Sequence, residues 1–129
     1  MLLFRKKKET AVTGRLGETY AVEYLIRHGY EILRKNYRKQ FGEVDIVARE
    51  KGTIVFVEVK TRRSDIFGTP SEAVDGRKQR QLSRIAQDYL LNHQLNDVAA
   101  RFDVVGVTLD PHNRPVTIEL IKNAFDVVG

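Results

Sequence analysis

The chain contains no cysteine, so neither a disulfide framework nor a thiolate metal site can form. Zinc ribbons are excluded, and the composition is compatible with a reducing compartment. No apolar run approaches the roughly 20 residues that a membrane-spanning helix needs. The N-terminal Leu-Leu-Phe precedes its basic residues, which is the wrong order for a signal peptide. We therefore expect a cytoplasmic protein with no membrane partner.

Several common functional patterns are also missing. The sequence has no Gly-rich phosphate loop, no Gly-x-Ser-x-Gly motif and no internal repeat. Its histidines, His28, His93 and His112, lack metal-ligand spacing to one another and are predicted to be surface or cap residues.

The charge balance favours an anionic partner. The 129 residues carry a net charge of +5 and a pI near 9.6, which suits nucleic acid, with DNA as the expected form. A hydrophobic content of 42% suits one compact domain that buries roughly two-thirds of its unfolded surface. We predict a basic, flexible N-terminal arm over residues 1–12, solvated or in contact with phosphates, and a single domain over residues 13–129.

Three ionisable side chains, Asp45, Glu58 and Lys60, interrupt two segments that are otherwise apolar and β-branched. Residues 50–52 between the segments are typical of a turn, so the stretch is predicted to be a hairpin. Residues 54–57 are apolar on both alternating faces, which predicts a strand covered on both sides. Charge in such a strand is unfavourable unless it is paired or binds a metal.

The hairpin register decides whether these charges meet. Glu58 and Lys60 share a face because strand side chains alternate with period two. If Arg49 pairs with Ile54 across a four-residue loop, Asp45 lies opposite Glu58 on that face. Two carboxylates and an ammonium group then converge.

This arrangement predicts metal-assisted phosphodiester hydrolysis. Opposed carboxylates repel by a few tenths to about 1 kcal/mol, and a divalent cation removes that penalty. We predict that Asp45 and Glu58 bind Mg²⁺ or Mn²⁺ beside a nucleic-acid backbone, where the metal lowers the pKa of a bound water. Lys60 is predicted to orient or deprotonate the attacking water, or to stabilise charge on the phosphate.

A Glu-x-Lys pattern on a strand also has a simpler interpretation. Most instances are cross-strand ion pairs or charged strand ends. Three features favour the functional interpretation: the adjoining strand is too apolar for a solvent face, an aspartate arrives across the hairpin, and a basic cluster follows.

Glu18 is a further acidic candidate. The spacing of Ala21, Val22 and Leu25 predicts a helix over about residues 13–28, and Glu18 lies on the same stripe, on the face that meets the sheet. Two interpretations are open. The carboxylate either interacts with the helix dipole as an early-turn anion or contributes to the site.

The remaining elements follow from hydrophobic period and turn signals. We predict strands over residues 30–38, 102–109 and 116–121, and a helix after Asp75-Gly76. Asp103 is expected to be a buried polar residue rather than a site residue. A loop with Gly68 and Pro70 is a candidate to cover the site or touch substrate.

Basic residues follow Lys60 and begin the second helix, and we expect them to contact nucleic acid: Arg62, Arg63, Arg77, Lys78 and Arg80. A basic run on a helix is usually a solvated face. Cations near a helix start oppose the macrodipole, however, which favours a phosphate-binding role. Lys78 precedes the apolar Leu82 by four residues and should point toward the sheet.

Four segments combine into one pattern: residues 14–18 (GRLGE), 42–48 (GEVDIVA), 55–62 (VFVEVKTR) and 101–105 (RFDVV). Together they resemble the YraN family, and the resemblance spans nearly all of residues 13–125. That family belongs to the restriction-endonuclease-like superfamily, which includes archaeal Holliday junction resolvases. The combined motifs are specific to the family, whereas the superfamily signature, PD-(D/E)-x-K, is loose.

The resemblance implies an α/β fold with a restriction-endonuclease-like mixed β-sheet flanked by helices. The signature carboxylates and lysine fall on Asp45, Glu58 and Lys60, and the helix glutamate falls on Glu18. Val44 replaces the proline of the signature. Because proline does no chemistry, the metal-binding prediction is unaffected.

The leading hypothesis is thus a Mg²⁺- or Mn²⁺-dependent endonuclease, with branched or structured DNA as a candidate substrate. A non-catalytic nucleic-acid-binding module and a protein-interaction component of DNA repair or uptake machinery are the alternatives. Junction cleavage would suggest a homodimer, since symmetric substrates suit symmetric enzymes.

Overall fold

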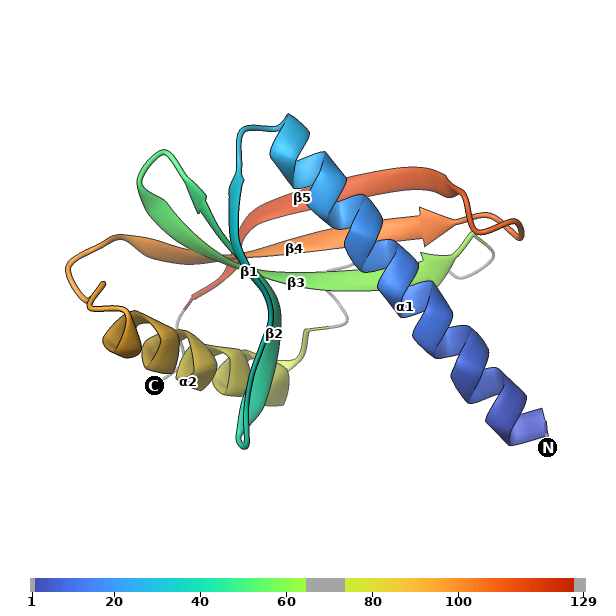
Figure 1. Cartoon of the computed structure of the whole chain (residues 1–129), viewed down its shortest axis with the longest axis horizontal. Coiled ribbons are helices and arrows are strands. Elements are labelled where there is room, and N and C mark those ends of the chain that lie inside the picture. The colour runs from blue at the N-terminus through green and yellow to red at the C-terminus, as the bar shows by residue number, and fades with distance from the viewer. Residues whose placement is uncertain (1, 65–73, 127–129) are drawn as a thin grey trace.

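A computed structural model of the chain describes residues 2–64 and 74–126, and only the backbone within residues 2–11. Its elements in chain order are α1 (Leu2–Arg27), β1 (Glu31–Lys39), β2 (Gly42–Glu50), β3 (Thr53–Arg63), α2 (Gly76–Asn92), β4 (Ala100–Leu109) and β5 (Pro115–Phe125). Figure 1 shows their arrangement. The loop with Gly68 and Pro70, a candidate to cover the site or touch substrate, lies outside the described residues.

The five strands form one sheet in the order β1-β2-β3-β4-β5. β3 and β4 run parallel, with α2 in the connection between them, and the other neighbouring strands are antiparallel. The predicted α/β fold, a mixed sheet flanked by helices, is confirmed.

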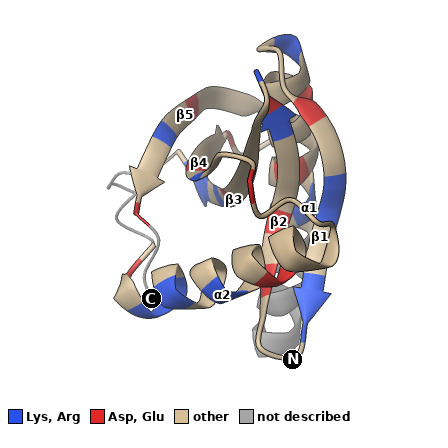
Figure 2. Cartoon of the chain, turned by 90° about the vertical axis from the view of Figure 1, so that its left-hand side faces the viewer, with Lys and Arg blue, Asp and Glu red and all other residues tan. Residues whose placement is uncertain are grey.

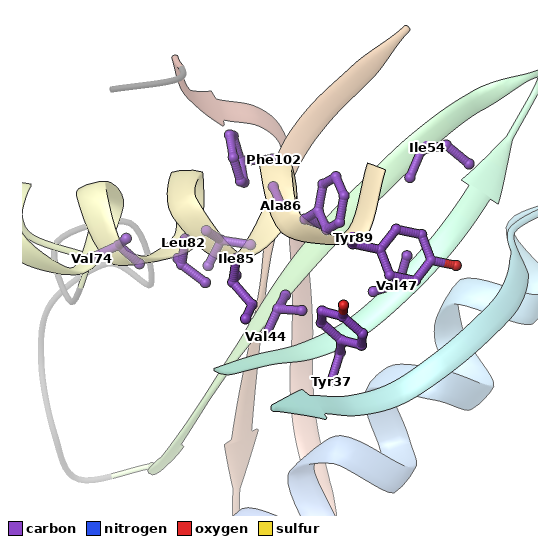
Figure 3. Close-up of a cluster of buried hydrophobic side chains, with 12 residues drawn as sticks. Tyr37, Val44, Val47, Ile54, Val74, Leu82, Ile85, Ala86, Tyr89 and Phe102 are labelled. Carbon is purple, nitrogen blue, oxygen red and sulfur yellow. The ribbon is translucent and has the colours of Figure 1, made fainter. Parts of the chain in front are cut away.

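Each face of the sheet is covered by one helix. On one face, Leu82 and Ile85 of α2 pack in a cluster with Phe56 of β3, part of which Figure 3 shows. On the other face, Leu25 of α1 packs in a cluster with Val57 of β3. Successive residues of β3 therefore face opposite helices, as predicted for a strand covered on both sides.

The β2–β3 hairpin has the predicted register, with Arg49 paired to Ile54. The ladder continues by one more pair, so the turn contains Lys51 and Gly52 instead of four residues. Both turn residues have positive φ, 49° and 81°. Such angles belong to a type I′ turn, whose twist matches that of the flanking strands. This turn fixes which residues of β2 and β3 oppose each other.

Helix α1 begins at Leu2 and not near residue 13 as predicted, so the segment predicted as a flexible arm, residues 1–12, is helical from Leu2 onward. Residues 1–12 contain no Gly or Pro and are rich in Leu, Lys and Arg, which have high helix propensity. The arm was predicted from the run of basic residues at positions 5–8, and such a run does not by itself decide the backbone conformation. No helix in the described part of the chain is long and apolar enough to cross a membrane.

The later elements follow the sequence pattern, with one longer strand. Asp75 caps α2, where its Oδ1 accepts a hydrogen bond from the Lys78 backbone N–H at 2.9 Å. β5 continues past the predicted end at Ile121 to Phe125. The added part is irregular, because Asn123 has a φ of 51° and the pairing register with β4 shifts.

Candidate active site

The candidate site lies where β2 and β3 separate. Their ladder ends at the Ile46–Val57 pair, and Figure 1 shows β2 curving away from β3. Asp45 is the next residue of β2, and its Oδ2 accepts a hydrogen bond from the Val59 backbone N–H at 2.8 Å. The side chain thereby satisfies a donor that the ladder no longer pairs. Asp45 and Glu58 come together as the register predicts, but where the two strands diverge and not within a continuous ladder. We call this point of divergence, at Asp45 and Glu58, the fork.

Glu58 is the buried carboxylate of this fork, with 4% of its surface exposed. Its Oε2 lies 3.1 Å from the Lys78 Nζ and 3.8 Å from the Lys60 Nζ. Its Oε1 has no hydrogen-bond partner among the described residues. Burial, and then the adjacent Asp45 carboxylate, raise the pKa of Glu58 to about 8, against the opposing effect of Lys78. Glu58 therefore holds a proton more readily than an ordinary carboxylate.

Glu18 of α1 reaches the same fork. Burial, and then the charge of Asp45, raise the pKa of Glu18, and Asn36 partly opposes them. Because α1 begins at Leu2, Glu18 lies far beyond the first turn, where a helix dipole acts on charges. The geometry therefore supports the second of the two interpretations, a third carboxylate beside the pair.

Gly17 allows this close approach of α1. A Cβ atom at this position would collide with the Thr61 side chain of β3. Only glycine therefore lets the helix lie this near the strand without movement of one or the other. Glu18 follows directly, so the contact sets its distance from the fork.

The basic side of the site is a pocket of about 280 Å³ at the start of α2, lined by Lys60, Asp75, Arg77, Lys78 and Gln81. As predicted, Lys78 points toward the sheet, since its ammonium group reaches Glu58. Figure 2 shows Lys and Arg residues along α2 and β1. The pocket thus joins the fork to a basic surface.

Three of the basic residues predicted to bind nucleic acid lie elsewhere. Arg62 Nε lies 3.5 Å from Thr108 Oγ1, and Arg63 donates to the Asp110 carbonyl at 3.3 Å, so both contact the chain at the far end of β4. Arg80 is on the exposed side of α2. Of the five basic residues, Arg77 and Lys78 are the two that line the pocket beside the fork.

Two polar residues beside the fork, Asn36 and Gln81, were not predicted from the sequence. Asn36 contacts Glu18, and a second pocket, of about 410 Å³ between α1 and β1, is lined in part by Asn36 and Lys35. Asn36 has a φ of 55° within β1. Asparagine is depleted in strands and tolerates a positive φ, so an asparagine inside a predicted strand could have marked Asn36 as a special position.

A second buried charge cluster lies around Asp103, which is fully buried. Asp103 accepts hydrogen bonds from the Tyr30 hydroxyl (2.9 Å), from Arg101 Nε (3.0 Å) and from the Asn123 N–H (2.9 Å). Arg101 also pairs with Glu50 at 2.6 Å. The prediction that Asp103 is a buried polar residue is confirmed.

The donor set at the fork suits a hard divalent cation that also binds water and substrate. In the described ranges, no group of three or more His, Asp or Glu side chains is placed to hold a metal ion by itself. Asp45 and Glu58 provide two carboxylates, and the unpartnered Oε1 of Glu58 is a buried acceptor without a donor in that same part of the chain. One or two carboxylates completed by water and phosphate oxygens are typical of Mg²⁺ sites. The residues therefore fit Mg²⁺ or Mn²⁺.

Comparison with known proteins places the chain in a family. The profile of the uncharacterised protein family UPF0102 matches residues 17–107. A UPF0102 protein of Caldicellulosiruptor bescii is 51% identical over 113 residues, which cover 87% of this chain and 95% of that protein. A UPF0102 protein of Syntrophus aciditrophicus is 53% identical over 115 residues, 89% of each chain.

Among solved structures, SfsA of Pyrococcus furiosus in complex with Ca²⁺ aligns with a TM-score of 0.38 and 14% identity. The alignment covers 88% of this chain and 62% of that one, a similarity too low to assign an activity. UPF0102 is the family that includes YraN, so these relatives confirm the resemblance that the motifs indicated. The chain belongs to the UPF0102 family.

Proposed function

We propose that the protein is a metal-dependent nuclease that hydrolyses phosphodiester bonds in DNA. One observation carries the proposal: Asp45 and the buried Glu58 meet at a fork in the sheet, with Lys60 and Lys78 against the same carboxylate. A structural ion pair between Glu58 and a lysine needs neither the Asp45 carboxylate nor an unpartnered oxygen on Glu58. A nuclease needs both, because a metal and a phosphate must meet there.

Asp45 and Glu58 would hold Mg²⁺ or Mn²⁺, which when bound lowers the pKa of a water and stabilises charge on the phosphate. The Val59 N–H fixes the orientation of the Asp45 carboxylate. Glu58 must release its proton before it can act as a ligand, and its raised pKa places that step near neutral pH. Glu18 is proposed as an auxiliary carboxylate beside Asp45.

Lys60 is proposed as the catalytic cation. Its side chain is 33% exposed, so the ammonium group is accessible to a backbone phosphate while it stays 3.8 Å from Glu58. There it would orient the attacking water or stabilise the negative charge that develops on the phosphate. Arg77 and Lys78 would bind neighbouring phosphates of the strand.

The test is cleavage of a labelled panel of single-stranded, duplex, flap and four-way-junction DNA with Mg²⁺, Mn²⁺ or EDTA. We expect metal-dependent cleavage by the wild type and a loss of at least about 100-fold in Lys60→Ala, the typical effect of removing one transition-state donor. Asp45→Ala should also lose cleavage but retain DNA binding. Unchanged cleavage in both variants would refute the proposal.

A non-catalytic nucleic-acid-binding module is the second candidate. One observation favours it: two lysines, Lys60 and Lys78, pair with Glu58, as in an ordinary structural ion-pair cluster. Under this alternative, DNA binding falls steeply with salt, is equal in EDTA and Mg²⁺, and no substrate of the panel is cleaved. If no DNA binds even at low salt, the basic surface instead suits an acidic protein partner of a repair or uptake machinery.

A preference for branched DNA, a homodimer and a cytoplasmic location are the finer parts of this proposal. Preferential cleavage of the four-way junction over duplex in the same panel would support the first. Light scattering of the protein with and without junction DNA would test the second, and fractionation of cells the third.

A further inference from the structure

We propose that Lys78 couples the binding of a backbone phosphate to the binding of the metal ion, by exchanging Glu58 for a phosphate in the pocket at the start of α2. The inference rests on the proposed function and deepens it, because it states how the same site is kept from binding metal without substrate. Lys78 is then a positioning residue and a built-in substitute for the cation.

Lys78 belongs to the pocket and to the fork at once. Its backbone N–H is held by Asp75 at 2.9 Å, which fixes the residue in the first turn of α2. Its side chain crosses from there to Glu58 Oε2, at 3.1 Å, and is 32% exposed. The flexible stem of lysine can move the charge to another acceptor nearby while the backbone stays in place.

The pocket that Lys78 lines has the chemistry of a phosphate site. Of its residues, Lys60, Arg77 and Lys78 are cations. The acidic member, Asp75, already uses its carboxylate to cap the helix. The N-terminus of α2, a helix of 17 residues, adds the positive end of its dipole. A phosphate that enters the pocket therefore meets donors and positive charge, and Lys78 is one of the groups that would turn toward it.

Glu58 cannot pair with Lys78 and bind a divalent cation with full strength at the same time. Two cations that share one carboxylate group repel each other, and a metal on Glu58 weakens the ion pair with Lys78. Lys60 lies further from the same oxygen, 3.8 Å against 3.1 Å, so Lys78 is the stronger competitor. A phosphate in the pocket gives Lys78 another partner and frees Glu58. By linkage, the phosphate then raises metal affinity and the metal raises DNA affinity by the same factor.

The experiment measures Mn²⁺ binding by electron paramagnetic resonance, without and with a DNA duplex whose integrity is checked on a gel. The proteins are the wild type, Lys78→Met, and Arg77→Met as matched control, since Arg77 lines the pocket without an ion pair to Glu58 in the described structure. Without DNA, Lys78→Met should bind Mn²⁺ about 5- to 50-fold more tightly than the wild type. DNA should increase the Mn²⁺ affinity of the wild type by a similar factor, and it should change the Mn²⁺ affinity of Lys78→Met little.

Arg77→Met should bind DNA more weakly, keep wild-type Mn²⁺ affinity without DNA and keep the coupling once saturated with DNA. Equal Mn²⁺ affinity of wild type and Lys78→Met without DNA would overturn the inference, as would the same effect of DNA on both proteins.

Asp45→Asn separates this failure from failure of the proposed function. If Asp45→Asn loses Mn²⁺ binding while Lys78→Met shows no change in coupling, the metal site is supported and only the coupling through Lys78 is wrong. If the wild type and every variant fail to bind Mn²⁺ with or without DNA, both the metal-dependent function and the coupling are wrong.

Discussion

Asp103 and Glu58 are buried carboxylates on neighbouring strands, yet their surroundings are opposite. Asp103 pairs in register with Val57, the residue before Glu58. Asp103 is 0% exposed and Glu58 is 4% exposed. Asp103 accepts bonds from Tyr30, Arg101 and the Asn123 N–H, whereas one oxygen of Glu58 has no partner among the described residues. Burial alone therefore does not distinguish Asp103 from Glu58, the proposed site residue. The two carboxylates differ in whether their oxygens have hydrogen-bond partners.

The pKa directions follow the same division. At Glu50, beside Asp103 in the structural cluster, burial raises the pKa, but hydrogen bonds and charges from Arg101 and Lys122 outweigh it, so that the net pKa is lowered. At Glu58, burial and Asp45 raise the pKa, and Lys78 only partly offsets them. One cluster is arranged to hold its negative charge, and the other keeps a carboxylate whose charge lacks full compensation.

The largest expected effect is on the structural cluster. Asp103→Ala should lower the free energy of unfolding by about 3–5 kcal/mol, because it breaks a buried network of hydrogen bonds and ion pairs. Arg101 would keep Glu50 as a carboxylate partner, but the Asn123 N–H would lose its acceptor. Urea denaturation measures the change in free energy. Asp97→Ala, at an exposed position, is the matched control and should stay within about 0.5 kcal/mol of the wild type. Equal effects of the two substitutions would show that the cluster around Asp103 contributes little stability.

The second prediction concerns metal binding at the fork. Mn²⁺ at about 100 times its dissociation constant should stabilise the protein by about 2.7 kcal/mol at pH 8, seen as a rise in Tm. The rise should shrink as the pH falls below about 8, because the raised pKa of Glu58 lets protons compete with the metal. Asp45→Asn should abolish it. A rise in Tm that persists in Asp45→Asn would place the metal elsewhere.

Local patterns predicted the elements on which this comparison depends. The β2–β3 hairpin follows from the turn signals at residues 50–52 between two β-branched segments, and the observed register is the one considered for it, with a shorter turn. The start of α2 follows from the cap at Asp75 and the amphipathic period. These features are decided by neighbouring residues, so a single sequence is sufficient to find them.

Contacts between distant segments were beyond such reasoning. The fork exists because the residues of β2 before Ile46 do not pair with β3, and nothing local in the sequence marks that end of the ladder. The contact of Gly17 with Thr61 and the ion pair of Lys78 with Glu58 each join a helix to a strand across the fold. For Lys78 the helical period gave the direction of the side chain but not its partner.

The third prediction tests how α1 positions its carboxylate. Gly17→Ala should destabilise the protein by about 1–3 kcal/mol, since the added methyl group collides with Thr61 unless helix and strand move apart. Such movement also carries Glu18 from the fork and should lower cleavage. Gly14→Ala is the control in the same helix. No described atom lies within 4 Å of its Cβ position, so it should be neutral or stabilise by up to about 1 kcal/mol. Equal effects of both substitutions would contradict the close contact.

The smallest expected change, and the sharpest test of the comparison, is Glu58→Gln. The neutral amide removes an incompletely compensated buried charge, so at pH 8 the variant should be about 1–2 kcal/mol more stable than the wild type although it loses cleavage. The folded-state pKa of about 8 lies above the ordinary pKa of a glutamate side chain, 4.5. As the pH rises between these values, the unfolded wild type releases the proton and the folded wild type retains it, so wild-type stability falls.

The advantage of Glu58→Gln should therefore vanish near pH 5 and grow toward pH 8, which urea denaturation at several pH values measures. A loss of stability at pH 8 would mean that Glu58 is held as firmly as Asp103. Two carboxylates in adjacent strands would then both be structural, and the case for a site at the fork would lose its main support. Opposite signs for the two substitutions require that the fold tolerates Glu58 for a use other than stability.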